Sequence, residues 1–212
     1  MQLAVERQKI VEYGRKMIAS GLVKSTGGNL SLANKDKSLL TITPTSTSYE
    51  TMLREDVVIY DFQGNHVEGL LKPSSEIQFH LDLINLREDI FAVVHTHSPH
   101  ATTLACLGWE LPAIHYLIGH AGYNVPVAPY ATFGTKELSD NICGAIGKGN
   151  AVLMANHGLV TVGKTLEKAF LRAELVEYVA QLYLQSRAVG NPNLISKEKM
   201  DIVLKKYSKY AQ

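Results

Sequence analysis

Hydrophobic positions near the start of the chain recur at helical spacing. Ile10, Val11, Met17 and Ile18 fall on one face, and Gly21 follows the last of them. Apolar residues three, four and seven positions apart share a helix face, and glycine commonly ends such a helix because it adopts the left-handed backbone conformation. The pattern therefore predicts an amphipathic helix that ends near Gly21.

Short apolar or alternating stretches follow, and they predict strands. The candidates are NLSLA, LLTIT, the two halves of VVIYDFQGNHVEG around a Gly-Asn turn, IFAVVHTH and AVLMANHGLVTV. Runs of about four to eight such residues bounded by turn residues are typical of strands. In the first half of the chain mostly short turns separate these runs, which favours antiparallel pairing.

Helical periodicity returns between and after the strands. Helices are expected in SSEIQFHLDLINL, where Ser75 and Gln78 have a capping-box spacing, in TKELSDNICGAI, in TLEKAFLRAELVEYVAQLYLQS, and after Ser196. Together the elements predict an α/β fold, a mixed and mainly antiparallel central sheet with helices on both faces. No Pro/Ser-rich linker divides residues 1–212, which we expect to form one domain.

The composition argues against several classes of partner. Lys and Arg number 21 against 20 Asp and Glu, and this net charge of +1 gives no reason to expect nucleic acid or an anionic membrane. No apolar run approaches the ~20 residues of a membrane span. We expect a soluble, cytoplasmic protein. Cys106 and Cys143 are expected as buried free thiols, because they lack a CxxC spacing.

Histidines behind two apolar stretches form the strongest candidate site. On a strand, His95 and His97 project to the same face while Thr96 points the other way, so both imidazoles can share one metal ion. An isolated pair of this kind can also be ordinary hydrogen-bonded histidines. His157 follows a second apolar run, and Gly158 after it lets the backbone turn. Three neutral imidazoles suit zinc or a similar divalent ion.

A carboxylate that can join these histidines lies in KPSSEIQFH. With Ser75 as the N-cap, Glu76 sits in the first helical turn, where it either reaches the ion or merely stabilises the helix end. His80 follows one turn later and is either a partner behind the metal ligands or an ordinary core or surface histidine. His100 lies beyond Pro99, and we expect it at the start of the next helix, outside the metal site.

Loops rich in hydroxyl groups are candidates for binding an anion. KSTGGNLSL, TPTSTSYE and KPSSE carry glycine, hydroxyl and amide side chains at turn positions, and the last of them adjoins a helix N-terminus. Each is ordinary loop composition when taken alone, but together they can hold a phosphate. No Walker lysine pattern and no GxGxxG follows a strand, so a nucleotide is not indicated.

The motifs TGGN, TPTS, PSSE, HTH, PAIHY, APYATFGT and NHGL occur in this order along the chain. In this order they resemble the zinc-dependent class II aldolases of the L-fuculose-1-phosphate aldolase type, over essentially the whole chain. The resemblance implies a Zn²⁺ ion, or another divalent metal, held by Glu76, His95, His97 and His157. It implies a substrate phosphate bound by Asn29, Thr45, Ser46, Ser74 and Ser75.

The resemblance also implies an activity, the reversible cleavage of L-fuculose 1-phosphate to dihydroxyacetone phosphate and L-lactaldehyde. Glu76 would move the proton on the dihydroxyacetone carbon, and Tyr116 of a neighbouring subunit would handle the proton of the aldehyde oxygen. Phe133 would form an apolar wall for the aldehyde, and Tyr210 would close over it from a mobile tail. The family forms homotetramers with active sites between subunits. It often has glycine at the place of Ser46, which puts a positive-φ turn there in doubt.

Three alternatives stay open on the same scaffold. Ribulose-phosphate 4-epimerases resemble this chain but usually carry the shorter Asp at the position of Glu76. A related sugar-phosphate lyase such as a dehydratase is the second alternative. The third is a metal-free, adducin-like interaction module; such domains have lost the ligands, whereas this chain retains all four candidates.

Overall fold

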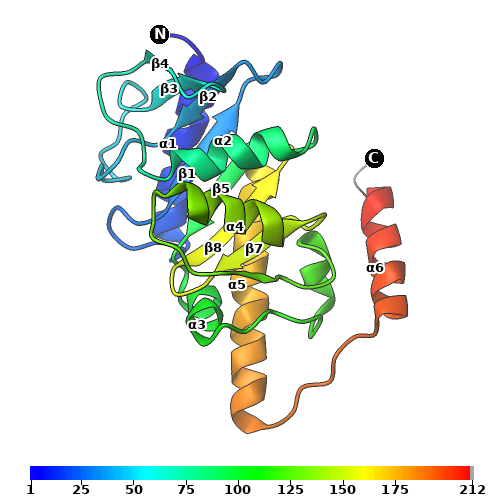
Figure 1. The fold of residues 1–212 in the computed structure, drawn as a ribbon. Helices are drawn as coiled ribbons and strands as arrows, with labels where there is room; N and C mark the ends of the chain where they lie inside the picture. Colours follow the sequence, from blue (N-terminus) through cyan, green and yellow to red (C-terminus); the bar gives the residue numbers. More distant parts are fainter. Residues whose placement is uncertain (211–212) are drawn as a thin grey trace.

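The computed structural model describes residues 1–210 and, for 208–210, the backbone alone. Within this part of the chain eight strands form one sheet. The strands are β1 (Asn29–Ala33), β2 (Leu39–Ile42), β3 (Val58–Asp61), β4 (His66–Glu68), β5 (Ala92–Thr96), β6 (Val127–Ala128), β7 (Ala151–Met154) and β8 (Gly158–Gly163). Their order is β4-β3-β2-β1-β5-β8-β7-β6 (Figure 1). Neighbours pair antiparallel except β6 and β7, which are parallel.

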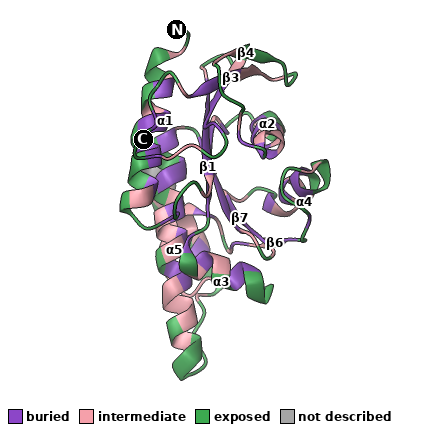
Figure 2. Cartoon of the chain, turned by 90° about the vertical axis from the view of Figure 1, so that its left-hand side faces the viewer, coloured by how far each residue is buried: buried purple, intermediate pink, exposed green. Residues whose placement is uncertain are grey.

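Helices cover both faces of this sheet, as the sequence predicts. They are α1 (Ala4–Ala19), α2 (Ile77–Leu86), α3 (Pro99–Leu107), the 3₁₀ helix η1 (Tyr116–His120), α4 (Lys136–Ile146), α5 (Leu166–Val189) and α6 (Lys197–Tyr210). Figure 2 shows α1, α3 and α5 on one face and α2 and α4 on the other. Helix α6 packs against η1, away from the sheet (Figure 1). The mixed, mainly antiparallel α/β fold is therefore confirmed.

Two hydrophobic cores follow from the alternation of side chains along the strands. The neighbours Val93 and Val94 in β5 are both fully buried, Val93 in the core beneath α2 and α4 and Val94 in the core beneath α1 and α5. Met17 of α1 and Phe79 of α2 are among the largest buried side chains on the two sides. Burial of each such side chain contributes about 1.5–3 kcal/mol, which holds the sheet rigidly between the helices.

The strand register brings distant segments to one edge of the sheet. Asn29 at the start of β1 pairs with His95 near the end of β5, and Thr96 pairs with Leu159 near the start of β8. Because β5 runs antiparallel to both neighbours, its carboxyl end lies beside the beginnings of β1 and β8. Three segments far apart in the sequence therefore meet where β5 ends.

Two expected elements differ in detail from the structure. AVLMANHGLVTV is a hairpin of β7 and β8 rather than one strand, because Asn156 takes a left-handed conformation with φ 56° and turns the chain. Helix α2 begins at Ile77 with Glu76 as the N-cap, so Glu76 precedes the first turn and Ser75 is not the cap. The amide of Glu76 donates to the Ser74 hydroxyl at 3.3 Å, and the amide of Ile77 donates to the Ser74 carbonyl at 3.1 Å.

The expectation that both cysteine thiols are buried differs from the structure. Cys106 and Cys143 are both free, as expected, but Cys106 is exposed on α3 and Cys143 is half-buried, so burial of both thiols was wrong. Helix α3 buries Ala101, Leu104 and Ala105, and Cys106 falls on its outer side. No helix in residues 1–210 has the length and the hydropathy to cross a membrane.

Candidate metal centre

Three histidine rings converge where β5 ends. His95 lies on β5, His97 directly follows it, and His157 lies in the β7–β8 turn; one ring nitrogen of each falls within 4.8 Å of the other two. The Nε2 atoms of His95 and His97 are 3.0 Å apart. The prediction that His95 and His97 share a face and meet His157 is confirmed. His157, however, reaches the cluster from a turn, not from the end of a strand.

The protonation of these rings suits metal binding. The Nδ1 atom of His95 is 3.0 Å from the Leu159 carbonyl oxygen, which can only accept, so Nδ1 carries the proton of the neutral ring and Nε2 is bare. Burial and the neighbouring histidines hold the pKa of His95 well below its ordinary value. Burial also lowers the pKa of His97 and of His157. Neutral imidazoles with bare nitrogens are the form that binds a divalent metal.

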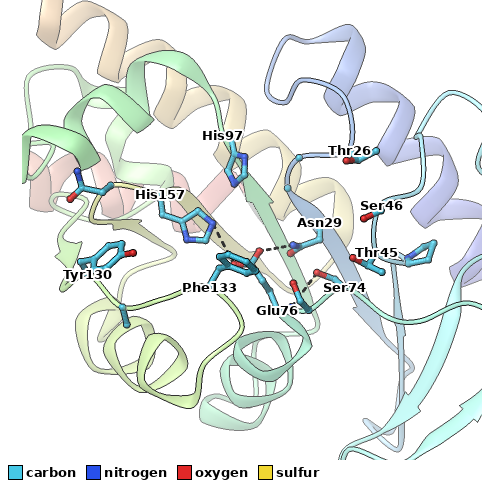
Figure 3. Close-up of a pocket in the computed structure, with 16 residues that line it drawn as sticks. Thr26, Asn29, Thr45, Ser46, Ser74, Glu76, His97, Tyr130, Phe133 and His157 are labelled. Carbon is cyan, nitrogen blue, oxygen red and sulfur yellow. Dashed lines mark hydrogen bonds and ion pairs between the residues drawn. The ribbon is translucent and has the colours of Figure 1, made fainter.

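Glu76 joins this cluster through both carboxylate oxygens (Figure 3). Its Oε2 accepts a hydrogen bond from Asn29 Nδ2 at 2.8 Å and lies 3.3 Å from His95 Nε2, and its Oε1 lies 3.4 Å from His157 Nε2. Burial raises the pKa of Glu76, while His157 and the hydrogen bond from Asn29 oppose the rise. Oε1 is buried, and no described residue donates a hydrogen bond to it. A buried carboxylate oxygen without a hydrogen-bond donor, close to the ring nitrogens of two histidines, is chemistry that a divalent cation satisfies.

Two glycines allow the strands to approach the histidines. A Cβ atom on Gly158 would lie 3.0 Å from Cδ2 of the His97 ring and closer still to the Thr96 carbonyl oxygen. Gly28 has φ +68°, and a Cβ there would strike the carbonyl oxygen of His95. Both positions therefore need glycine, for close approach at Gly158 and for the left-handed backbone at Gly28.

A cleft of about 470 Å³ opens beside the cluster, between the loops that precede β1 and α2 and the loop before α4 (Figure 3). The predicted site residues that line it are Asn29, Thr45, Ser46, Ser74, Ser75, Glu76, His97, Phe133 and His157. Other residues without a predicted role also line it, among them Thr26, Tyr130 and Asn156. The motifs TGGN, APYATFGT and NHGL contain these three residues. Their place in those motifs was the one sequence signal that could have identified them as site residues.

Backbone hydrogen bonds join the two hydroxyl-bearing loops of the cleft. The amide of Thr45 donates to the Lys72 carbonyl, and the amide of Ser74 donates to the Thr43 carbonyl, each at 3.0 Å. Ser46 has φ 54°, so the positive-φ turn that a glycine would favour is present with a serine. A non-glycine residue in this conformation costs about 1–2 kcal/mol, which indicates that the surrounding loop holds it in place.

Four other predicted positions have distinct surroundings. Phe133 is 66% exposed at the mouth of the cleft. Tyr116 begins η1, is half exposed, and lies outside the set of described residues that line the cleft. Tyr210 is the last residue of α6, and its side chain is outside the described part of the chain. His100 lies in α3, and its Nδ1 is 2.7 Å from Glu177, so its expected place outside the metal cluster is confirmed.

Comparison with known proteins places this geometry in a family. Residues 8–184 match the family described as class II aldolase and adducin N-terminal domain. A protein of Bacillus thuringiensis serovar kurstaki, named 5-deoxy-D-ribulose 1-phosphate aldolase, is 49% identical over 212 residues, 100% of both chains. The L-fuculose phosphate aldolase of Escherichia coli K12 is 42% identical over 205 residues, 96% of this chain and 94% of that protein.

A solved structure agrees with the sequence matches. A protein named L-fuculose 1-phosphate aldolase superposes with a TM-score of 0.96 at 41% identity, and the match covers 98% of each chain. The sequence match thus spans most of the chain, and the fold agrees over nearly its full length. This chain belongs to the class II aldolase and adducin N-terminal domain family.

Proposed function

We propose that the chain is a metal-dependent aldehyde-lyase that cleaves a ketose 1-phosphate reversibly to dihydroxyacetone phosphate and a short aldehyde. The observation that carries the proposal is the buried Oε1 of Glu76, to which no described residue donates a hydrogen bond, beside the converging ring nitrogens of the histidine cluster, at the foot of a cleft lined by hydroxyl groups. Family membership alone does not decide the point, because the family description includes adducin domains.

The residues present fit a divalent ion, for which zinc is the first candidate. His95, His97, His157 and Glu76 would hold it. A bound ion of this kind supplies a Lewis acid that stabilises negative charge on the ketose oxygens while the carbon–carbon bond breaks. Cobalt and manganese accept similar ligands, so the physiological metal is a matter for measurement.

The hydroxyl groups of the cleft would bind the substrate phosphate. The amide of Asn29 and the hydroxyls of Thr45, Ser46, Ser74 and Ser75 all face this space. No lysine or arginine of the described chain lines it, so neutral donors and the N-terminus of α2 would be what this chain provides to the phosphate site. Such a site binds phosphate by many hydrogen bonds rather than by a strong opposite charge.

Two proton movements complete the reaction, and chain residues are available for both. Cleavage removes the proton of the C4 hydroxyl and adds one to C3, which becomes a carbon of dihydroxyacetone phosphate. Glu76 would deliver the proton to C3, because its carboxylate lines the cleft beside the histidine cluster. Tyr116 of a neighbouring subunit would accept the C4 proton, and Tyr210 would close the site. A homotetramer with shared active sites is therefore part of the proposal, because Tyr116 lies away from the cleft of its own chain.

We propose 5-deoxy-D-ribulose 1-phosphate as the first substrate and L-fuculose 1-phosphate as the second. Relatives with these two names are 49% and 42% identical to this chain. Both sugars give dihydroxyacetone phosphate and differ only in the aldehyde, acetaldehyde against lactaldehyde. Phe133, at the cleft mouth, would pack against the methyl end of either aldehyde.

A substrate comparison tests this proposal. We would measure kcat/KM for both ketose 1-phosphates with zinc-loaded protein, following dihydroxyacetone phosphate by its enzymatic reduction. A higher value for 5-deoxy-D-ribulose 1-phosphate supports the order given, and a higher value for L-fuculose 1-phosphate reverses it. L-Ribulose 5-phosphate serves as the test of the epimerase alternative. If the protein inverts C4 of L-ribulose 5-phosphate and cleaves neither ketose 1-phosphate, the aldolase proposal is wrong and the epimerase alternative takes its place.

A further inference from the structure

A chain of four buried polar side chains runs from Glu76 into the sheet. Asn29 Nδ2 donates to Glu76 Oε2 at 2.8 Å, Asn29 Oδ1 lies 2.5 Å from His80 Nε2, and His80 Nδ1 lies 2.7 Å from the Ser31 hydroxyl. All four side chains are buried; His80 and Ser31 are 0% exposed. Water therefore does not compete for these hydrogen bonds, and each group depends on its neighbour in the chain.

The direction of every hydrogen bond follows from the Glu76 end. An ionised carboxylate only accepts, so the group of Asn29 that faces it must be the NH₂. The Asn29 carbonyl oxygen then faces His80, and Nε2 of His80 must carry the ring proton to donate to it. Nδ1 of the neutral ring is left bare, so the Ser31 hydroxyl donates to it. One tautomer of His80 therefore corresponds to one orientation of the Asn29 amide.

His80 itself is unsuited to proton transfer or to metal binding. Complete burial lowers its pKa to about 3, so the ring stays neutral across the working pH range. Both of its ring nitrogens are engaged, one with Asn29 and one with Ser31. The ring stacks on Phe79 with centroids 4.5 Å apart, which fixes its plane. The remaining function that these contacts allow for His80 is to orient the side-chain amide of Asn29.

We propose that His80 is a positioning residue, which holds the Asn29 amide in the one orientation that serves both Glu76 and the substrate phosphate. With His80 in place, one amide hydrogen of Asn29 holds Glu76 Oε2, so that Oε1 is directed at His157, and the second amide hydrogen is left for a ligand in the cleft. Without it, the amide can flip and set its oxygen against the carboxylate. The link to the phosphate rests on the proposed function, whereas the link to Glu76 does not.

Variants of His80 separate positioning from packing. His80→Gln keeps a donor near the place of Nε2, His80→Asn keeps only a group near Nδ1, and Thr41→Val is the control. Thr41 is an equally buried hydroxyl that donates to the Leu32 carbonyl, without a link to Glu76. We expect His80→Asn to lower zinc affinity and kcat by about 10- to 100-fold, as found for groups that orient metal ligands. His80→Gln should recover most of both losses, and Thr41→Val should change neither.

Zinc affinity is measured by competition with a chelator of known affinity, so this arm needs no substrate. Equal values for His80→Asn and wild type, or an equal loss in His80→Asn and His80→Gln, would overturn the proposal. Failure of the wild type to cleave any ketose 1-phosphate would end the proposed function, while the zinc measurement would still decide the role of His80 toward Glu76.

Nitrogen NMR of the wild type provides a second reading, which holds even where the variants fail to fold. The ¹⁵N shifts of a neutral imidazole distinguish the protonated from the bare nitrogen. We expect His80 to show a protonated Nε2 and a bare Nδ1, unchanged between about pH 5.5 and pH 8. A protonated Nδ1, or a positively charged ring in this range, would contradict the assigned direction of the chain.

Discussion

Oε1 of Glu76 lies 3.4 Å from Nε2 of His157, and no described residue donates a hydrogen bond to it. This arrangement leaves a buried carboxylate oxygen facing an imidazole nitrogen without a hydrogen bond between them. A cation between such groups removes the penalty of burying them unpaired. The relationship therefore connects the fold, which brings Glu76 and His157 together, to the metal chemistry that we propose.

Replacing His157 tests which histidines hold the ion. We expect His157→Ala to weaken zinc binding by about 100-fold or more and to abolish cleavage, because it removes one of three converging imidazoles. His100→Ala is the matched control, since His100 contacts Glu177 on α5 instead. It should retain one zinc ion per chain after gel filtration, measured by atomic emission. Equal zinc loss in the two variants would contradict the ligand assignment.

Ser46 offers a test of the phosphate site that separates its hydroxyl from its backbone. Ser46→Ala removes the donor, and we expect KM for the ketose 1-phosphate to rise about tenfold with little change in kcat. Ser46→Gly relieves the left-handed backbone at φ 54°, so the free energy of unfolding should rise by up to about 1 kcal/mol relative to Ser46→Ala. An unchanged KM in Ser46→Ala would remove this hydroxyl from the phosphate site.

Subunit mixing tests the predicted role of Tyr116 across an interface. Glu76→Gln should lower kcat by about 10²- to 10⁴-fold, and Tyr116→Phe should also be impaired. When the two variants are unfolded, mixed in equal amounts and refolded, about a quarter of the sites in a fourfold ring would combine an intact Glu76 with an intact Tyr116. We therefore expect activity to return to about that fraction of wild type. No recovery in the mixed, reassembled protein would contradict a site to which Glu76 and Tyr116 come from different subunits.

The stability of the metal-free protein should fall as the pH drops below neutral. Burial lowers the pKa of His80 from 6.5 to about 3. Between pH 6.5 and pH 3 the imidazole is therefore protonated in the unfolded chain and neutral in the folded chain. From pH 6.5 to pH 5 this costs about 2 kcal/mol in the free energy of unfolding. The raised pKa of Glu76 acts in the opposite direction.

Urea unfolding at pH 6.5 and pH 5, in wild type and in His80→Gln, measures the contribution of His80 to the pH dependence of the free energy of unfolding. Glu76 is present in both proteins, so its contribution cancels in the comparison. The variant should lose less stability on acidification, since it has no ring to protonate. The same pH dependence in both proteins would show that His80 does not contribute this term.

Much of the fold and of the metal cluster could be predicted from the sequence. Alternation along β5 was enough to put His95 and His97 on one face, and the helical pattern of TKELSDNICGAI was enough to predict α4. These signals are local, and the period of a strand or the chemistry of a cap determines them.

The rest depends on contacts between segments far apart in the sequence. The role that we propose for His80 depends on β1 lying beside α2, which no local pattern shows, and both alternatives for this histidine stayed open in the sequence. One strand was expected over AVLMANHGLVTV because apolar residues flank the β7–β8 turn on both sides, although Asn156 tolerates the left-handed conformation that separates the two strands. Tyr116 and Tyr210 remain predictions, since a single chain cannot show what a neighbouring subunit contributes.

Release of dihydroxyacetone phosphate with and without metal tests the central claim most directly. Wild-type protein would be stripped with a chelator, divided, and assayed on 5-deoxy-D-ribulose 1-phosphate and L-fuculose 1-phosphate before and after zinc is restored to one ion per chain. We predict no cleavage by the stripped protein and cleavage of at least one of the two sugars after zinc is added. Absence of dihydroxyacetone phosphate from the zinc-loaded protein with both sugars, or equal cleavage by the stripped protein, would contradict the account.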